Sequence, residues 1–119
     1  MTGRLSSVVF DCSDPHRLAH FYSELLGLPV TRVDGDWVDI GDGPARLSFQ
    51  HAPGHQPPRW PDPAFPQQVH LDIHVDDLDE AGEHATAVGA RLASHQPQDD
   101  VRVYLDPVGH PFCLFLHEG

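Results

Sequence analysis

The chain has 119 residues, of which 39% are hydrophobic, so it is long enough for one domain with a packed core. Its eighteen Asp and Glu residues stand against seven Arg and no Lys, and the resulting net charge of −11 disfavours nucleic acid and anionic membranes as partners. The absence of lysine also excludes Schiff-base chemistry. No apolar run has membrane-spanning length and the first residues lack the apolar core of a signal peptide, so we expect a cytoplasmic protein.

The first half of the chain predicts a strand, a helix and three further strands. Residues 5–12 are apolar and β-branched, as in a strand. Asp14 and Pro15 suit the start of a helix, and Gly27 suits its end. Between them, apolar residues recur at helical spacing. The three further strands are expected at residues 30–33, 37–40 and 46–50.

Residues 51–68 have a different composition, because six of them are proline. Proline disfavours both a helix and a central strand, so we expect an ordered but irregular linker. Beyond it the same order of elements returns. These elements are a strand at 69–75, a helix capped by Asp77 and ended by Gly89, and strands at 91–93, 101–105 and 112–117.

The two halves therefore read as a duplicated βαβββ unit. The capping aspartates Asp14 and Asp77 and the terminating glycines Gly27 and Gly89 have nearly the same separation along the chain. We expect an α+β fold of paired βαβββ modules within a single domain, residues 1–119. Module one covers about 1–50, the linker 51–68 and module two about 69–119.

Several short motifs resemble the vicinal oxygen chelate superfamily, which includes glyoxalase, bleomycin-resistance and extradiol dioxygenase proteins. The resemblance covers nearly the whole chain. It rests on Asp14-Pro15, Phe21-Tyr22 and Leu26-Gly27-Leu28 in the first half, and on His70 to Ile73, Val75 to Asp79 and Asp106 to Phe112 in the second. It implies sheets that curl into a cleft, and a homodimer.

The resemblance also implies where a metal would be held, by one residue from each of four strands. In this chain those positions are occupied by Ser7, Ser48, His70 and Cys113. Only His70 is a residue type that the family uses as a ligand. We therefore expect an incomplete metal site and no cofactor, with a bound divalent metal as the alternative, and metal-dependent dioxygenase activity is not expected.

Alternation along the strands predicts which side chains lie together on the sheet face away from the helices. His70, Asp72 and His74 alternate with apolar residues and share one face. The same reasoning gives the candidate substrate-binding residues, which are Trp37, Ser48, Gln50, Arg102, Tyr104 and Cys113. This face is either the wall of a small-molecule pocket or the solvated side of a half-covered sheet.

His70, Asp72 and His74 are the candidate catalytic residues, because histidine titrates near neutral pH and a carboxylate can orient it. Two histidines two residues apart on a strand can instead chelate a metal, with Asp72 as a third ligand. Cys113 is either a nucleophile or a small packing residue. Trp60, in the linker, either packs or covers the pocket.

Two functions fit this pattern. The first is an enzyme of the glyoxalase type, a lyase or isomerase acting on a small polar metabolite, in which Arg102 holds an oxyanion. The second resembles the bleomycin-resistance branch, in which an acidic cleft binds a cationic drug or metabolite without catalysis. In both, the partner is a small molecule and neither nucleic acid nor a membrane.

Overall fold

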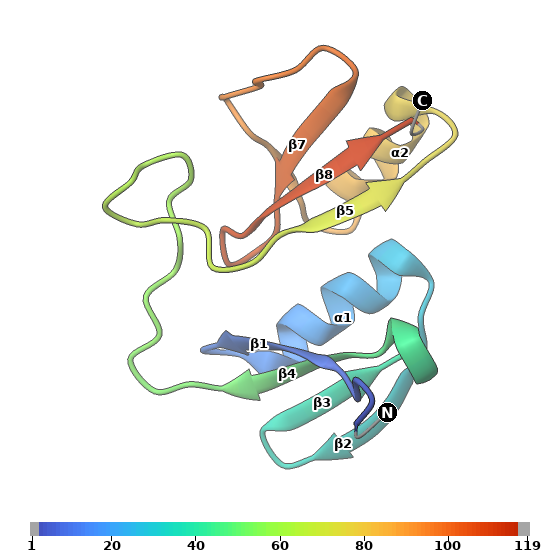
Figure 1. Ribbon diagram of the computed structural model, residues 1–119, viewed down its shortest axis with the longest axis vertical. Helices are drawn as coiled ribbons and strands as arrows, with labels where there is room; N and C mark the ends of the chain where they lie inside the picture. Colours follow the sequence, from blue (N-terminus) through green and yellow to red (C-terminus); the bar gives the residue numbers. More distant parts are fainter. Residues whose placement is uncertain (1–2, 117–119) are drawn as a thin grey trace. The chain divides into compact units, whose positions relative to one another are not determined.

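Figure 1 shows the computed structural model of the chain, which describes residues 3–116. The chain divides into two compact units, Met1–His55 (unit 1) and Gln56–Gly119 (unit 2). Each unit packs one α-helix on a four-stranded mixed sheet and repeats the order β-α-β-β-β. The predicted α+β class and the paired βαβββ modules are confirmed.

The sheet of unit 1 has the strand order β1-β4-β3-β2, in which β1 is parallel to β4 and the other neighbours are antiparallel. Its elements in chain order are β1 (Val8–Cys12), α1 (Pro15–Leu26), β2 (Val30–Asp34), β3 (Trp37–Ile40), the 3-10 turn η1 (Gly43–Ala45) and β4 (Leu47–His51). The turn η1 joins β3 to β4.

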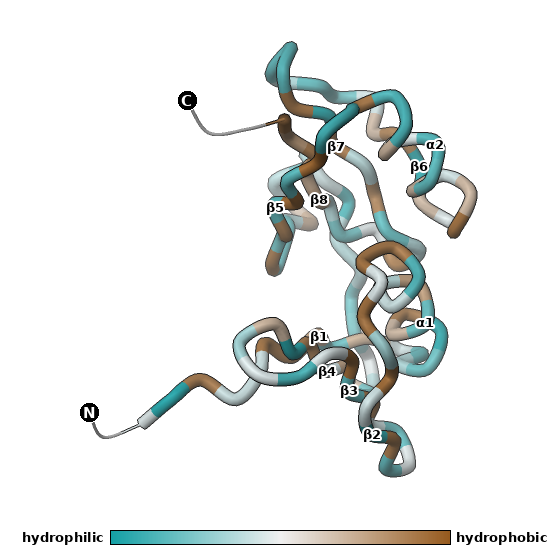
Figure 2. Tube along the Cα trace, turned by 90° about the vertical axis from the view of Figure 1, so that its right-hand side faces the viewer, coloured by the Kyte–Doolittle hydropathy of each residue, from teal (hydrophilic) through white to brown (hydrophobic). Residues whose placement is uncertain are grey.

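Helix α1 begins and ends where the sequence predicts. The Asp14 side chain accepts a hydrogen bond from the backbone N–H of Arg17 at 3.1 Å, and Gly27 ends the helix with a left-handed φ of 68°. The apolar face of α1 packs on the sheet. Tyr22 lies 5.3 Å from the Phe10 ring and 5.8 Å from the Phe49 ring, centroid to centroid. This aromatic cluster lies in the core of unit 1. Figure 2 colours the chain trace by hydropathy, with apolar residues in brown.

Unit 2 repeats this topology, with the strand order β5-β8-β7-β6 and a parallel β5–β8 pair. Its elements are β5 (Leu71–His74), α2 (Leu78–Ala87), β6 (Arg91–Leu92), β7 (Val101–Leu105) and β8 (Pro111–Phe115). The Asp77 side chain caps α2 by accepting from the backbone N–H of Glu80 at 3.0 Å. The duplicated order of elements thus produces a duplicated sheet.

The core of unit 2 lies between α2 and one face of its sheet. Phe112 and Leu114 are fully buried there, and Tyr104 stacks on Phe112 with 6.1 Å between ring centroids. The Tyr104 hydroxyl lies so close to Gly82 of α2 that a side chain at position 82 would displace the tyrosine. A small residue in the helix therefore makes room for a large one in the strand.

The proline-rich segment contains no helix or strand between residues 52 and 70, as predicted, and most of it belongs to unit 2. It is ordered by local contacts. The Arg59 guanidinium lies 4.6 Å from the centre of the Phe65 ring, and the Arg59 N–H donates to the Phe65 carbonyl at 2.8 Å.

The strand bounds differ from the predicted ones at several ends. The first strand starts at Val8 instead of residue 5, the strand predicted at 69–75 covers only Leu71–His74, and the last strand is Pro111–Phe115. Residue 117, at the end of the last predicted strand, lies outside the described residues. No helix in the described part of the chain is long and apolar enough to cross a membrane.

Candidate functional site

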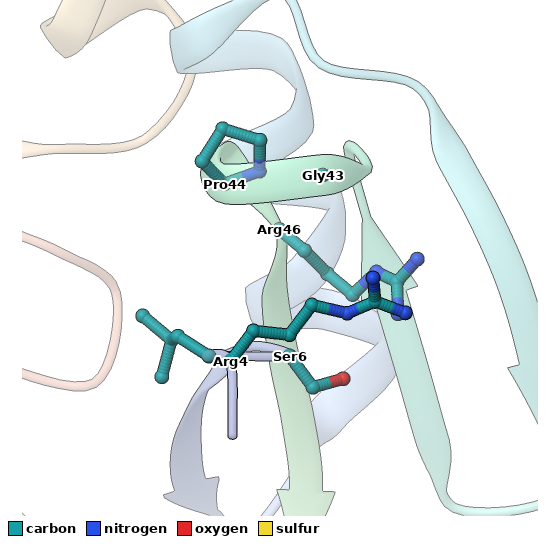
Figure 3. Close-up of a pocket in the computed structure, with 6 residues that line it drawn as sticks. Arg4, Ser6, Gly43, Pro44 and Arg46 are labelled. Atoms are coloured by element: carbon teal, nitrogen blue, oxygen red, sulfur yellow. The ribbon is translucent and has the colours of Figure 1, made fainter. Parts of the chain in front are cut away.

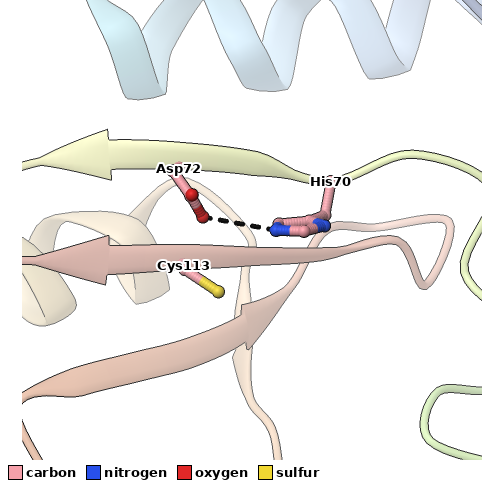
Figure 4. A group of neighbouring side chains, drawn as sticks. All are labelled: His70, Asp72 and Cys113. Carbon is pink, nitrogen blue, oxygen red and sulfur yellow. Dashed lines mark ion pairs between the residues drawn. The ribbon is translucent and has the colours of Figure 1, made fainter.

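Three side chains of unit 2 converge at the edge of its sheet (Figure 4). His70 directly precedes β5, and Asp72 of β5 is paired with Cys113 of β8 in the parallel register. His70 Nε2 lies 3.3 Å from Asp72 Oδ1, and one ligand atom from each of the three residues lies within 4.8 Å of the others. The structure therefore brings together a nitrogen, an oxygen and a sulfur donor that are separated in the sequence.

The environment of the cluster keeps the thiol of Cys113 protonated. Partial burial raises the pKa of Cys113, and the negative charge of Asp72 and a hydrogen bond to that carboxylate raise it further. Because the thiolate is the nucleophilic form, this thiol is a poor nucleophile at neutral pH without a nearby cation. The environment of Cys113 therefore favours a hydrogen-bonding thiol over a covalent nucleophile.

A pocket of about 110 Å³ lies beside His70 and Cys113 in unit 2. Its lining comprises Trp60, Gln67, His70, Pro97, Gln98, Val101, Val103, Pro111 and Cys113. Trp60 thus contributes to the pocket as well as packing on His95, with 5.3 Å between ring centroids. Gln67 and Gln98 were not predicted, because they lie in segments without strand or helix periodicity, where alternation gives no signal.

The prediction of which β7 side chains lie on the face away from α2 is wrong. Val101 and Val103 are paired with Phe115 and Cys113 of β8 and share the face of the cluster. Arg102 and Tyr104, predicted to bind substrate there, point to α2 instead. Arg102 Nη1 contacts Asp79 Oδ1 of α2 at 2.7 Å, which raises the pKa of Arg102.

The error has a physical reason. Alternation separates two sets of side chains, but it does not say which set faces the helix. The prediction assumed that the more apolar set is the buried one. In β7 the more apolar set lines the pocket, while the Tyr104 ring fills the core and Arg102 reaches the solvent-exposed acid of the helix.

The third predicted catalytic residue, His74, does not line this pocket. It is exposed at the far end of β5, and its ring lies 5.5 Å from that of Phe115. Of the three candidates, the structure pairs His70 with Asp72 and leaves His74 further along the strand.

In unit 1 the predicted residues Trp37, Ser48 and Gln50 do share the sheet face away from α1, as the β3–β4 register shows. Asp39 on the same face is 5% exposed and accepts hydrogen bonds from Trp37 Nε1 at 2.7 Å and from Ser48 Oγ at 2.6 Å. Gln50 donates to Asp11 at 2.7 Å. Asp39 was not among the predicted site residues, although it alternates with the apolar residues Val38 and Ile40 in the sequence.

The residues at the family's metal positions do not fit a metal in unit 1. The hydroxyls of Ser7 and Ser48 are hydrogen-bonded to each other at 2.9 Å, and neither is a ligand that divalent transition metals prefer. In unit 2, His70, Asp72 and Cys113 are the group among the described residues that could hold a metal ion. Three such ligands with an open fourth position are a donor set that Zn²⁺ accepts.

Comparison with known proteins gives a consistent result. The family model of the glyoxalase-like domain matches residues 7–115. No curated protein matches the chain.

Solved structures of the same fold cover nearly the whole chain. A glyoxalase/bleomycin resistance protein/dioxygenase family enzyme from Burkholderia phytofirmans PsJN is 17% identical, with a TM-score of 0.72 over 94% of this chain and 97% of that one. A bleomycin resistance determinant encoded on transposon Tn5 is 22% identical, with a TM-score of 0.65 over 98% of this chain and 100% of that one. A bleomycin-binding protein in complex with bleomycin is 20% identical, with a TM-score of 0.58 over 98% of this chain and 100% of that one.

Proposed function

Because the chain belongs to the glyoxalase-like domain family, we propose that it binds a small organic molecule in the pocket of unit 2. One observation carries this proposal: the His70–Asp72 pair and Cys113 converge beside a pocket that Trp60 also lines. A binding site of this kind combines aromatic surface with a few converging polar groups.

The chemistry of the lining favours a ligand with a flat apolar part and a cationic group. Trp60, Val101 and Val103 provide apolar contact, and the Trp60 ring can also attract a cation. Asp72 carries a carboxylate next to His70, and a chain of net charge −11 attracts cations from solution. The pocket volume of about 110 Å³ suits one group of a ligand and is too small for a whole drug-sized molecule.

Binding is better supported than catalysis, because the pocket lacks the group that the enzymatic alternative requires. That alternative assigned Arg102 to an oxyanion, but Arg102 is paired with Asp79 at α2. His70 and Asp72 remain able to move a proton, so catalysis without a metal would depend on these two residues.

The proposal is tested by NMR titration of the full chain with bleomycin and with benzyltrimethylammonium, a small aromatic cation. We expect saturable shifts of the Trp60 indole N–H, while the Trp37 indole in unit 1 acts as the internal reference. His70→Ala and Asp72→Asn should each weaken binding by about tenfold, equivalent to about 1.4 kcal/mol. Equal shifts of both indoles, or unchanged affinity in both variants, would contradict the proposal.

His20→Ala is the matched control for these variants. His20 is an exposed histidine 3.8 Å from a carboxylate, Glu24, but it lies on α1 of unit 1. Its loss should leave binding unchanged, so a general effect of removing a surface histidine is separated from loss of the site.

A second candidate, a metal-dependent enzyme, is favoured by the three ligand atoms within 4.8 Å. A bound divalent metal would polarise a substrate oxygen and would require His70 neutral and Cys113 deprotonated. Elemental analysis of protein purified without a His tag or chelators tests this candidate, supported by the thiolate absorption of the Co²⁺-loaded chain. About one equivalent of metal, lost in His70→Ala, would replace the binding proposal. No metal after incubation with zinc, nickel and manganese would exclude the second candidate.

We propose further that the protein is a cytoplasmic homodimer. The chain has two cysteines and neither forms a disulfide, as is usual in a reducing compartment. Light scattering should give twice the monomer mass, and cell fractionation should recover the protein with cytosolic markers. A monomer, or a membrane-associated fraction, would contradict the respective part of this proposal.

A further inference from the structure

We infer that unit 1 contains a second binding site, in which Arg4 and Arg46 hold an oxyanion group, a phosphate or a carboxylate, of a small molecule. This site is independent of the pocket in unit 2. It takes a ligand group of opposite charge to the one proposed there.

The site is a cavity of about 670 Å³ between the segment before β1 and the turn η1. Its lining comprises Arg4, Leu5, Ser6, Gly43, Pro44 and Arg46. Figure 3 shows the side chains of Arg4 and Arg46 extending in the same direction, with the Ser6 hydroxyl below them. Two guanidiniums and a hydroxyl are hydrogen-bond donors of the kind that oxyanions accept from.

The charges of this cavity are not balanced by the protein. Within residues 3–116, neither Arg4 nor Arg46 forms an ion pair, and none of the described residues that line the cavity is acidic. By contrast, Arg32 and Arg102 are paired with Asp34 and Asp79. Within residues 3–116, Arg32 and Arg102 are the arginines that form ion pairs, so the lack of a pair alone does not distinguish Arg4 and Arg46. What distinguishes them is that both line one cavity that no described acidic residue lines.

A second observation concerns the Arg46 side chain itself. Its Nε is buried and has no hydrogen-bond partner among the described residues. A buried N–H that lacks an acceptor costs free energy, and an anion seated against the guanidinium supplies that acceptor. The repulsion between two neighbouring cations is relieved by the same anion.

The site is tested by NMR titration of the full chain with glycerol phosphate and with succinate, each at constant ionic strength against sodium chloride. We expect saturable shifts of the Ser6 and Gly43 amides, with a Kd of about 1 mM for the anion that binds. Arg4→Gln and Arg46→Gln should each weaken binding about tenfold or more, while Arg46→Lys should weaken it less, because lysine keeps the charge but not the planar fork.

The two anions distinguish whether the site binds a phosphate group or a carboxylate group. A phosphate monoester becomes a dianion as the pH rises through about 6. If glycerol phosphate binds more tightly over this pH range, the ligand class of the site is a phosphate monoester. Binding of succinate without this pH dependence assigns a carboxylate. Either result supports the site, provided that Arg4→Gln and Arg46→Gln both weaken binding of that anion.

Arg91→Gln is the matched control, since Arg91 is exposed on β6 of unit 2. Arg4 precedes the first strand, so Arg4→Gln keeps the test valid even if Arg46→Gln perturbs the fold. Shifts that do not saturate, or that Arg91→Gln reduces as much as Arg4→Gln, would overturn the site. His70→Ala should leave anion binding intact, so failure here is distinguishable from failure of the proposed function.

Discussion

The two units place different chemistry at equivalent positions of the same scaffold. In unit 1, Val9 is paired with Ser48 across the parallel strands, and in unit 2 Asp72 is paired with Cys113 in the same place. On the next strand, Asp39 of unit 1 is paired with Ser48, and Val103 of unit 2 with Cys113. At these equivalent positions each unit therefore has one acid, but the acids lie on different strands.

The strand that carries the acid decides what the acid can do. Asp39 lies on an inner strand, and the hydroxyl of Ser48 and the indole of Trp37 donate to it. Asp72 lies on the edge strand β5, its side chain is 63% exposed, and it contacts His70. A buried acid whose donors are within the protein stabilises the fold, whereas an exposed acid at a pocket is free to contact a ligand.

The largest expected effect tests whether the two units unfold together. Phe49 is fully buried against Phe10 and Tyr22, so Phe49→Ala should lower the free energy of unfolding by about 4 kcal/mol. Denaturation followed by single-tryptophan fluorescence reports unit 1 through Trp37 and unit 2 through Trp60. If the chain is one cooperative domain, both transitions shift equally. A shift confined to Trp37 would show two independent units, and Val33→Ala at an exposed position is the neutral control.

The next effect tests the contrast between the two acids directly. Asp39→Val introduces the residue that unit 2 has at the equivalent position and leaves the donors of Trp37 and Ser48 without their acceptor. We expect a loss of about 3 kcal/mol in unfolding free energy. Asp72→Val should change it by less than about 0.5 kcal/mol, because Asp72 is exposed. Similar losses in chemical denaturation would refute the contrast.

A smaller effect concerns the thiol at the cluster. Asp72→Asn removes a charge that raises the pKa of Cys113, so more thiolate forms at pH 7.5 and alkylation by iodoacetamide should be faster. The increase should stay below about tenfold, because burial is the larger cause and remains. Mass spectrometry of the labelled chain measures it, with fully buried Cys12 as the unreactive reference. An unchanged rate would mean that Asp72 does not act on the thiol.

The smallest expected effect checks the corrected face of β7. Arg102→Gln removes an exposed ion pair with Asp79 on the helix side of the sheet. Affinity for benzyltrimethylammonium should change by less than about twofold, because exposed pairs contribute little and Arg102 does not line the pocket. A tenfold change in affinity in the same titration would show that Arg102 contributes to ligand binding.

Local patterns accounted for the elements and for part of the site. Asp14, Asp77 and Gly27 marked helix ends correctly, because capping depends on a residue and its immediate neighbours. The shared face of Trp37, Ser48 and Gln50 also followed from alternation. Alternation placed His70 and Cys113 on the same face, and the family resemblance gave both as metal positions. The register of β5 with β8 shows how they meet.

What the sequence by itself determined is the duplicated βαβββ order, the helix boundaries and the two sets of side chains on each strand, because these depend on spacing along the chain. Only the tertiary structure decided which set of β7 faces α2, because that depends on the Tyr104 ring fitting against Gly82 and on Arg102 reaching Asp79. The pocket residues Gln67 and Gln98 and the pair Arg4 and Arg46 likewise come from irregular segments far apart in sequence. No periodicity connects such residues, and packing alone brings them together.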